Sequence, residues 1–138
     1  MTTSERHFIG GCLCGALRYD AKGEPLYAGC CYCTDCRKAS GSGFIPFLGF
    51  TRNAVRMSGQ TVKYRSKGDS GAQAVRNFCS VCSSLVFGGD VSEDTWNLYA
   101  GSLDDVSQFQ PRIAIFARRL PAWIMIPPGL KTFAGLPP

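Results

Sequence analysis

The segment AGCCYCTDCRKASG, residues 28–41, contains four of the eight cysteines of this chain, Cys30, Cys31, Cys33 and Cys36. Three arrangements would explain such a cluster: disulfide bonds, a closed structural metal site, or a metal site with one coordination position left open. Cys31 and Cys33 are too close along the chain to form a disulfide easily. Disulfides also persist mainly in oxidising compartments. The segment therefore favours coordination of a metal by cysteine.

Length and composition limit the kind of protein to which this segment belongs. We expect the 138 residues to form a single domain over 1–138, large enough to bury a core without covalent staples. No apolar run has the length of a signal peptide or a membrane span, so we expect a cytoplasmic protein without membrane association. The net charge of +5 is mild and no long basic run is present, so nucleic acid is not an expected partner.

The rest of the chain predicts a mainly-β domain of many short strands. Short apolar or alternating runs recur between turn residues. They are residues 16–21, 43–50, 54–57, 61–66, 74–79, 84–88, 96–101 and 112–117. Helix is limited to one or two short turns, one capped by Thr34 and running through 35–40, the other through 102–107. The tail 127–138 contains four prolines and is predicted to be irregular.

The remaining cysteines allow two partitions. Zinc bound by four thiolates at about 2.3 Å needs its sulfurs roughly 3.8 Å apart. Joining Cys12 and Cys14 to Cys79 and Cys82 gives a closed site and leaves 31, 33 and 36 as a three-thiolate site with an open fourth position. The alternative joins Cys33 and Cys36 to Cys79 and Cys82 as an ordinary two-knuckle site. Spacing alone leaves both partitions open.

Five segments together resemble a known family. GGCLCGALRY, CYCTDCRKASG, FCSVCSS, AGSLDD and an ending with P, IF and PAW resemble the glutathione-dependent formaldehyde-activating enzymes. That family includes centromere protein V and has the Mss4-like fold, a compact set of β-sheets. The match runs over residues 10–123.

The resemblance implies two zinc ions per chain. Cys12, Cys14, Cys79 and Cys82 would hold a structural zinc, and Cys31, Cys33 and Cys36 a catalytic zinc. It also implies a carbon–sulfur lyase-type reaction in which glutathione and formaldehyde form S-(hydroxymethyl)glutathione. The sulfur of glutathione would take the open position of the catalytic zinc.

Several residues depart from the family pattern. The histidine usual after the first cysteine of the middle motif is Tyr32, the glycine usual after Cys82 is Ser83, and Ala114 stands where many members have histidine. The only histidine, His7, lies outside every motif. No imidazole is therefore placed to act as general base, and a different thiol or aldehyde stays open as the substrate.

Two further residues are candidates for the substrate side of the site. Tyr32 could hydrogen-bond a bound oxygen, and Arg37 could attract an anionic tripeptide or lower a thiol pKa. Packing of Tyr32 and a surface ion pair of Arg37 are the structural alternatives. Cys30 is interpreted as a buried apolar residue, with a redox-sensitive thiol as the alternative. A zinc-stabilised binding module, a redox- or metal-responsive protein and a homo-oligomer also remain open.

Overall fold

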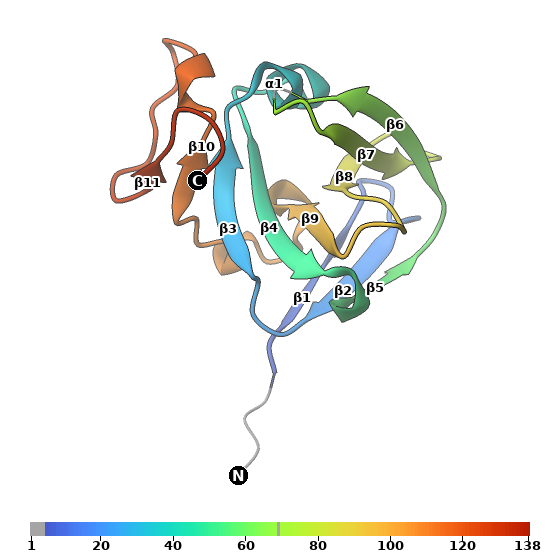
Figure 1. The fold of residues 1–138 in the computed structure, drawn as a ribbon. Helices are drawn as coiled ribbons and strands as arrows, with labels where there is room; N and C mark the ends of the chain where they lie inside the picture. Colours follow the sequence, from blue (N-terminus) through green and yellow to red (C-terminus); the bar gives the residue numbers. More distant parts are fainter. Residues whose placement is uncertain (1–4, 69) are drawn as a thin grey trace.

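The computed structural model describes residues 5–68 and 70–138 and confirms a mainly-β fold (Figure 1). The strands are β1 His7–Gly11, β2 Arg18–Lys22, β3 Tyr27–Cys31, β4 Ile45–Thr51, β5 Val55–Ser58, β6 Thr61–Lys67, β7 Gln73–Cys79, β8 Leu85–Gly88, β9 Thr95–Tyr99, β10 Ile113–Ile115 and β11 Lys131–Thr132. Within these described ranges one α-helix, α1, spans Thr34–Ser40. Single 3-10 turns are η1 Arg52–Ala54, η2 Ala100–Ser102, η3 Val106–Gln108 and η4 Ala117–Arg119.

The strands form two sheets. The smaller has the order β1-β2-β5 and is antiparallel. The larger has eight strands in the order β11-β10-β3-β4-β9-β8-β7-β6. Its pairs are antiparallel except where β10 lies parallel to both β3 and β11. As Figure 1 shows, α1 follows β3 at one end of this sheet.

The main core lies between the two sheets. Buried side chains of the small sheet, including Phe8 and Tyr19, pack with Leu48 and Phe50 of β4 and with Leu98 of β9. Because side chains alternate along a strand, the residue before Leu48 belongs to a different cluster. Phe47 packs instead with Cys31, Cys33 and the residues around them. One face of the large sheet therefore forms the core, and the other carries three of the cysteines.

The short helix begins as predicted within one residue, but its cap is different. The N-cap is Cys33, not Thr34, and the Cys33 sulfur accepts a hydrogen bond from the Cys36 backbone N–H at 3.2 Å. The helix ends at Gly41, whose left-handed φ of 68° favours glycine. The second predicted turn, at 102–107, is instead divided between η2 and η3.

Each of the eight predicted runs overlaps a strand, but three strands were missed. They are β1, β3 and β11. The missed β3 contains Ala28 and Gly29, which are small residues with weak strand preference. Its strand form follows from its place between β4 and β10 in the large sheet.

The prediction of an irregular tail over 127–138 is wrong at Lys131–Thr132. These residues pair with β10, and the backbone N–H of Phe133 donates to the carbonyl of Ala114 at 2.8 Å. Tertiary pairing provides the hydrogen bonds that a proline-rich segment cannot provide for itself. Among the described residues no helix is long and apolar enough to cross a membrane.

Candidate metal centres and the adjoining pocket

The first cysteine group joins two distant parts of the chain. Cys12 and Cys14 follow β1, Cys79 is the last residue of β7, and Cys82 lies in the turn after it. All four sulfurs lie within 4.8 Å of one another. The Cys12 and Cys14 sulfurs are 3.6 Å apart, and those of Cys14 and Cys79 are 3.8 Å apart. Four thiolates around one tetrahedral zinc would lie about 3.8 Å apart, so this donor set fits such an ion.

Backbone N–H groups point at the sulfurs of this closed group. Leu17 donates to the Cys12 sulfur at 3.2 Å, and Val81 and Cys82 donate to the Cys79 sulfur at 3.3 and 3.4 Å. The Ser84 hydroxyl lies 3.1 Å from the Cys82 sulfur and helps to lower the pKa of that thiol to about 5. Hydrogen bonds to sulfur favour the thiolate that a metal requires.

The second group lies on the large sheet and contains three cysteines. Cys31 ends β3, Cys33 caps α1, and Cys36 lies in the first turn of the helix. Their sulfurs lie within 4.8 Å of one another, and no other His, Cys, Asp or Glu of the described chain completes the group. Cys33 and Cys36 do not gather with Cys79 and Cys82, as the two-knuckle alternative would require. Three thiolates with one free position are the donor set of an open metal site.

The three thiols together favour negative charge on one sulfur. The hydrogen bond with Cys31, followed by that with Cys36, lowers the Cys33 pKa well below its usual value. The same contact with Cys33 raises the Cys31 pKa. The Cys36 pKa is raised to about 11, because the hydrogen bond with Cys33 and burial outweigh the opposite effect of Cys31. A cation bound among the three sulfurs would relieve this competition and favour three thiolates.

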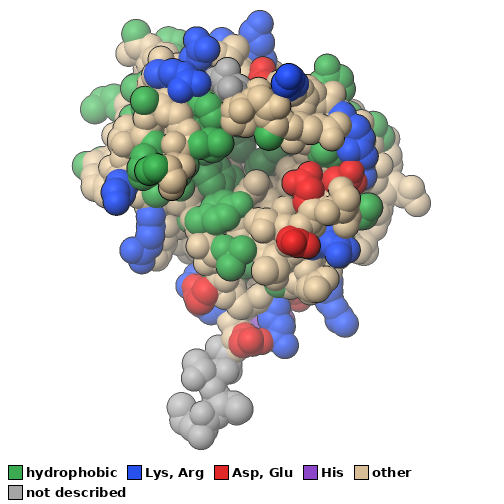
Figure 2. Space-filling model, viewed as in Figure 1, with side chains coloured by type: hydrophobic (Ala, Val, Ile, Leu, Met, Phe, Trp, Pro, Cys, Tyr) green, Lys and Arg blue, Asp and Glu red, His purple; other side chains and the backbone are tan. Residues whose placement is uncertain are grey.

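This open group faces a cavity of about 420 Å³, within the range of small-molecule sites. Side chains that line it include Cys31, Cys33, Cys36, Phe47, Arg76, Tyr99, Phe116 and Leu136. The face in Figure 2 is hollowed near its centre, and hydrophobic side chains lie in and around the hollow. The C-terminal tail forms part of the wall through Leu136 and Pro137. The cavity is therefore mostly apolar, with a cysteine group at its wall.

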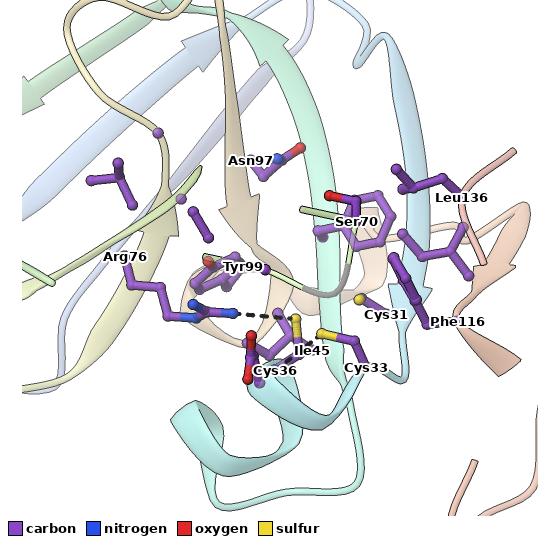
Figure 3. A pocket seen from close by; sticks show the side chains of 18 of the residues that line it. Cys31, Cys33, Cys36, Ile45, Ser70, Arg76, Asn97, Tyr99, Phe116 and Leu136 are labelled. Atoms are coloured by element: carbon purple, nitrogen blue, oxygen red, sulfur yellow. Dashed lines mark hydrogen bonds between the residues drawn. The ribbon is translucent and has the colours of Figure 1, made fainter. Parts of the chain in front are cut away.

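Arg76 is the buried cation of this pocket. Its side chain is only 8% exposed, and it extends from β7 toward the cysteines (Figure 3). One guanidinium nitrogen lies 3.8 Å from the Cys36 sulfur, and the other lies 3.4 Å from the Ser66 hydroxyl. A fixed positive charge here stabilises negative charge on the sulfurs.

Comparisons with known proteins identify the family of this chain. A family model described as "Glutathione-dependent formaldehyde-activating enzyme" matches residues 7–119. The chain belongs to this family. A curated relative from Halomonas elongata is named "Putative glutathione-dependent formaldehyde-activating enzyme". It is 29% identical over 140 residues, an alignment that covers 93% of this chain and 87% of the relative.

Two candidates for the substrate side do not line this pocket. Tyr32 is fully buried and packs with Cys30, Ala114 and Phe44, on the side of the chain opposite Cys31 and Cys33. It does not line the pocket, because side chains alternate along extended backbone. Arg37 is half-buried on α1 and is also not among the lining residues. A role of these two residues on the substrate side therefore stays a prediction that the lining of this pocket does not support.

Other residues of this family member behave as structural groups. Cys30 is 2% exposed, and burial raises the pKa of its thiol to about 11, consistent with its interpretation as a buried apolar residue. Ala114 lies fully buried beside it in the same cluster. His7 pairs with Asp20 on the surface at 2.8 Å. No histidine lies in the pocket among the described residues.

Sequence reasoning missed Arg76 and Tyr99. Arg76 lies 40 positions from Cys36 along the chain, so spacing gave no link between them. A signal was present, because Arg76 interrupts the apolar run AVRNFC in a strand that ends at a cysteine. A charged residue in a buried strand requires a partner. Tyr99 gave no comparable signal, since aromatic residues are ordinary in strands.

Proposed function

We propose that this protein is a zinc-dependent enzyme that joins formaldehyde to the sulfur of a small thiol. The family description names glutathione and formaldehyde, and this supports our proposal that the thiol is glutathione, the product S-(hydroxymethyl)glutathione and the reaction of the carbon–sulfur lyase type. The observation that carries the proposal is a three-cysteine group with a free position beside a cavity of about 420 Å³. A closed site without a cavity would not admit a substrate.

The two cysteine groups would hold two zinc ions with different tasks. Cys12, Cys14, Cys79 and Cys82 would hold a structural zinc, since four thiolates leave no position free. Cys31, Cys33 and Cys36 would hold the catalytic zinc. At the open position that zinc would keep the substrate thiol ionised near neutral pH.

The chain's own residues prepare the site around that position. The Cys36 N–H holds the Cys33 sulfur, and Arg76 balances the charge of the cysteine group. Apolar side chains that include Phe47 and Ile115 line the cavity and would displace water from the reacting atoms, which would strengthen electrostatic interactions there. Binding a thiol and an aldehyde together in this cavity would also reduce the entropic barrier of their reaction.

The test is a paired measurement of zinc content and rate. Cys33→Ser is the informative variant, because serine can still cap α1 while the sulfur ligand is lost. We expect two zinc ions per chain in the parent and about one in Cys33→Ser, with the fold intact. The rate of hydroxymethylglutathione formation should fall to the uncatalysed background, which must be subtracted because formaldehyde and thiols combine unaided.

Cys30→Ser is the matched control. It removes a cysteine from the same segment that lies outside both groups, so it should retain two zinc ions and the parent rate. A parent with one zinc, or a Cys33→Ser variant with an unchanged rate, would contradict the proposal.

A further inference from the structure

Tyr99 brings a hydroxyl to the wall of the pocket near the cysteine group. It lies on β9 opposite Phe47 of β4. Its side chain packs against the buried cluster that contains Cys31 and Cys33, and it lines the cavity. Figure 3 shows it between Arg76 and the wall formed by Phe116 and Leu136.

The Tyr99 hydroxyl has no hydrogen-bond partner within residues 5–68 and 70–138. Two other tyrosines differ in this respect. The Tyr27 hydroxyl donates to the Asn97 side chain at 2.7 Å, and the Tyr19 hydroxyl lies 2.7 Å from that of Ser102. A half-buried tyrosine hydroxyl usually has a partner. Within the part of the chain that the structure describes, Tyr99 therefore presents an unused donor to the cavity.

A glycine makes room for this hydroxyl. A Cβ atom at position 88 would lie 2.8 Å from the Tyr99 oxygen, too close for an undisturbed side chain. Gly88 of β8 thus leaves room for the Tyr99 side chain at the cavity wall. Beside it, the Arg76 Nε atom is buried and also has no partner among the described residues. A donor and a fixed cation therefore adjoin the same part of the cavity.

The proposed reaction needs a donor of this kind. A carbon–sulfur bond forms as the thiolate adds to the aldehyde carbon, and the π electron pair of the carbonyl moves to oxygen. That oxygen then takes a proton from water, while the proton of the substrate thiol has passed to solvent, so charge and atoms balance. Hydrogen-bond donors fixed at the developing oxyanion are among the strongest catalytic contributions known.

We infer that the Tyr99 hydroxyl donates a hydrogen bond to the aldehyde oxygen during this addition, and that Arg76 supports the negative charge there. The inference rests on the proposed function. In this assignment Tyr99 polarises the aldehyde carbonyl, and no histidine lines the described pocket that could do so instead.

Tyr99→Phe tests the assignment because it removes one oxygen and retains the ring. We expect kcat for hydroxymethylglutathione formation to fall about 100-fold, as when one oxyanion donor is lost. KM for glutathione, zinc content and the thermal unfolding midpoint should stay at parent values. Tyr19→Phe is the matched control, since it removes a buried tyrosine hydroxyl far from the pocket and should leave kcat unchanged.

The outcomes separate this inference from the proposed function. A parent that does not exceed the uncatalysed rate overturns the proposed function and the inference with it. If the parent is active and the kcat of Tyr99→Phe lies within about threefold of the parent value, the inference is overturned and the proposed function is not. A lower rate accompanied by loss of zinc or by a lower midpoint also overturns it, because Tyr99 would then be structural.

Discussion

The two cysteine groups use the same ligand atom in opposite surroundings. The closed group, with four cysteines, connects the loop after β1 to the turn after β7, and backbone N–H groups surround its sulfurs. The open group, with three cysteines, lies on the far face of the large sheet between a cavity and a buried arginine. The number of ligands and the neighbouring space distinguish the groups, whereas the residue type does not.

This difference gives the two sites separate tasks. A metal in the closed group would stabilise the fold, and a metal in the open group would take part in the reaction. The closed group joins segments that are far apart along the chain, since Cys14 and Cys79 are separated by 65 positions, so a metal there would stabilise the fold. The open group lies on strands and a helix that the sheet already positions. A metal there would be free to exchange its remaining ligand. Substitutions in the two groups should therefore have different consequences.

The largest expected effect is that of Cys79→Ser. Cys79 is 1% exposed and belongs to the closed group. A structural zinc contributes about 10–16 kcal/mol in small domains, comparable with a whole domain's stability of about 5–15 kcal/mol. We expect the variant to lose its β-sheet signal in far-UV circular dichroism at 25 °C, whereas Cys33→Ser retains it. A folded Cys79→Ser protein with the parent midpoint would remove the distinction between the groups.

Arg76→Ala should have the next largest effect, confined to the open group. Loss of a charged neighbour of a metal ligand typically lowers metal affinity about 10–100-fold. Chelator competition should therefore release one zinc earlier from Arg76→Ala, with the second zinc unchanged. Arg37→Ala is the matched control, because Arg37 follows Cys36 in sequence but does not line the pocket. If both variants released zinc equally early, the net charge of the protein, and not the position of Arg76 beside Cys36, would determine the zinc affinity.

The contrast between Arg37 and Arg76 shows what sequence could and could not predict. Short-range features were accessible, because Cys-x-Cys and Cys-x-x-Cys spacings and alternating apolar runs reflect local geometry. Arg76 and Tyr99, the pocket residues that sequence reasoning missed, lie far along the chain from Cys36, on β7 and β9. Strand order alone brings them to the pocket, and nothing in a local pattern gives that order.

Tyr32 shows a second limit of sequence reasoning. Its position between two cysteines left open whether it faces their site or packs in the core. In extended backbone an intervening residue points to the opposite side, so Tyr32 packs with Cys30 while Cys31 and Cys33 face the cavity. Strand β3 was missed for the same reason. We did not predict from the sequence that this segment is extended.

Gly88→Ala should have a smaller effect that again concerns only the open group. The added methyl group would lie 2.8 Å from the Tyr99 oxygen and displace that side chain. Small displacements of a positioned group reduce rates substantially, and we expect kcat to fall about tenfold or less with both zinc ions retained. Gly101→Ala is the control, since a Cβ atom there meets nothing within 4 Å. Equal rates for both variants would show that the position of Tyr99 is not critical.

The smallest effect concerns an ion pair on the same side of the fold as the closed group. Arg18 of β2 binds both oxygens of Asp104, and this hydrogen bonding lowers the pKa of the Asp104 carboxyl. A lowered folded-state pKa adds stability above the unfolded-state value of about 3.9 and loses it as the pH falls through the folded value. Because the pair is exposed, Asp104→Asn should lower the midpoint at pH 7 by only about 1–3 °C.

The lower unfolding midpoint of Asp104→Asn should depend on pH and salt. The difference between Asp104→Asn and the parent should narrow as the pH falls below about 4, and it should also narrow in 1 M salt because exposed charges are screened. Zinc content should stay at the parent value, since the carboxyl is not among the grouped ligands. If Asp104→Asn instead released zinc, the closed group would depend on surrounding ion pairs and not on its own four sulfurs.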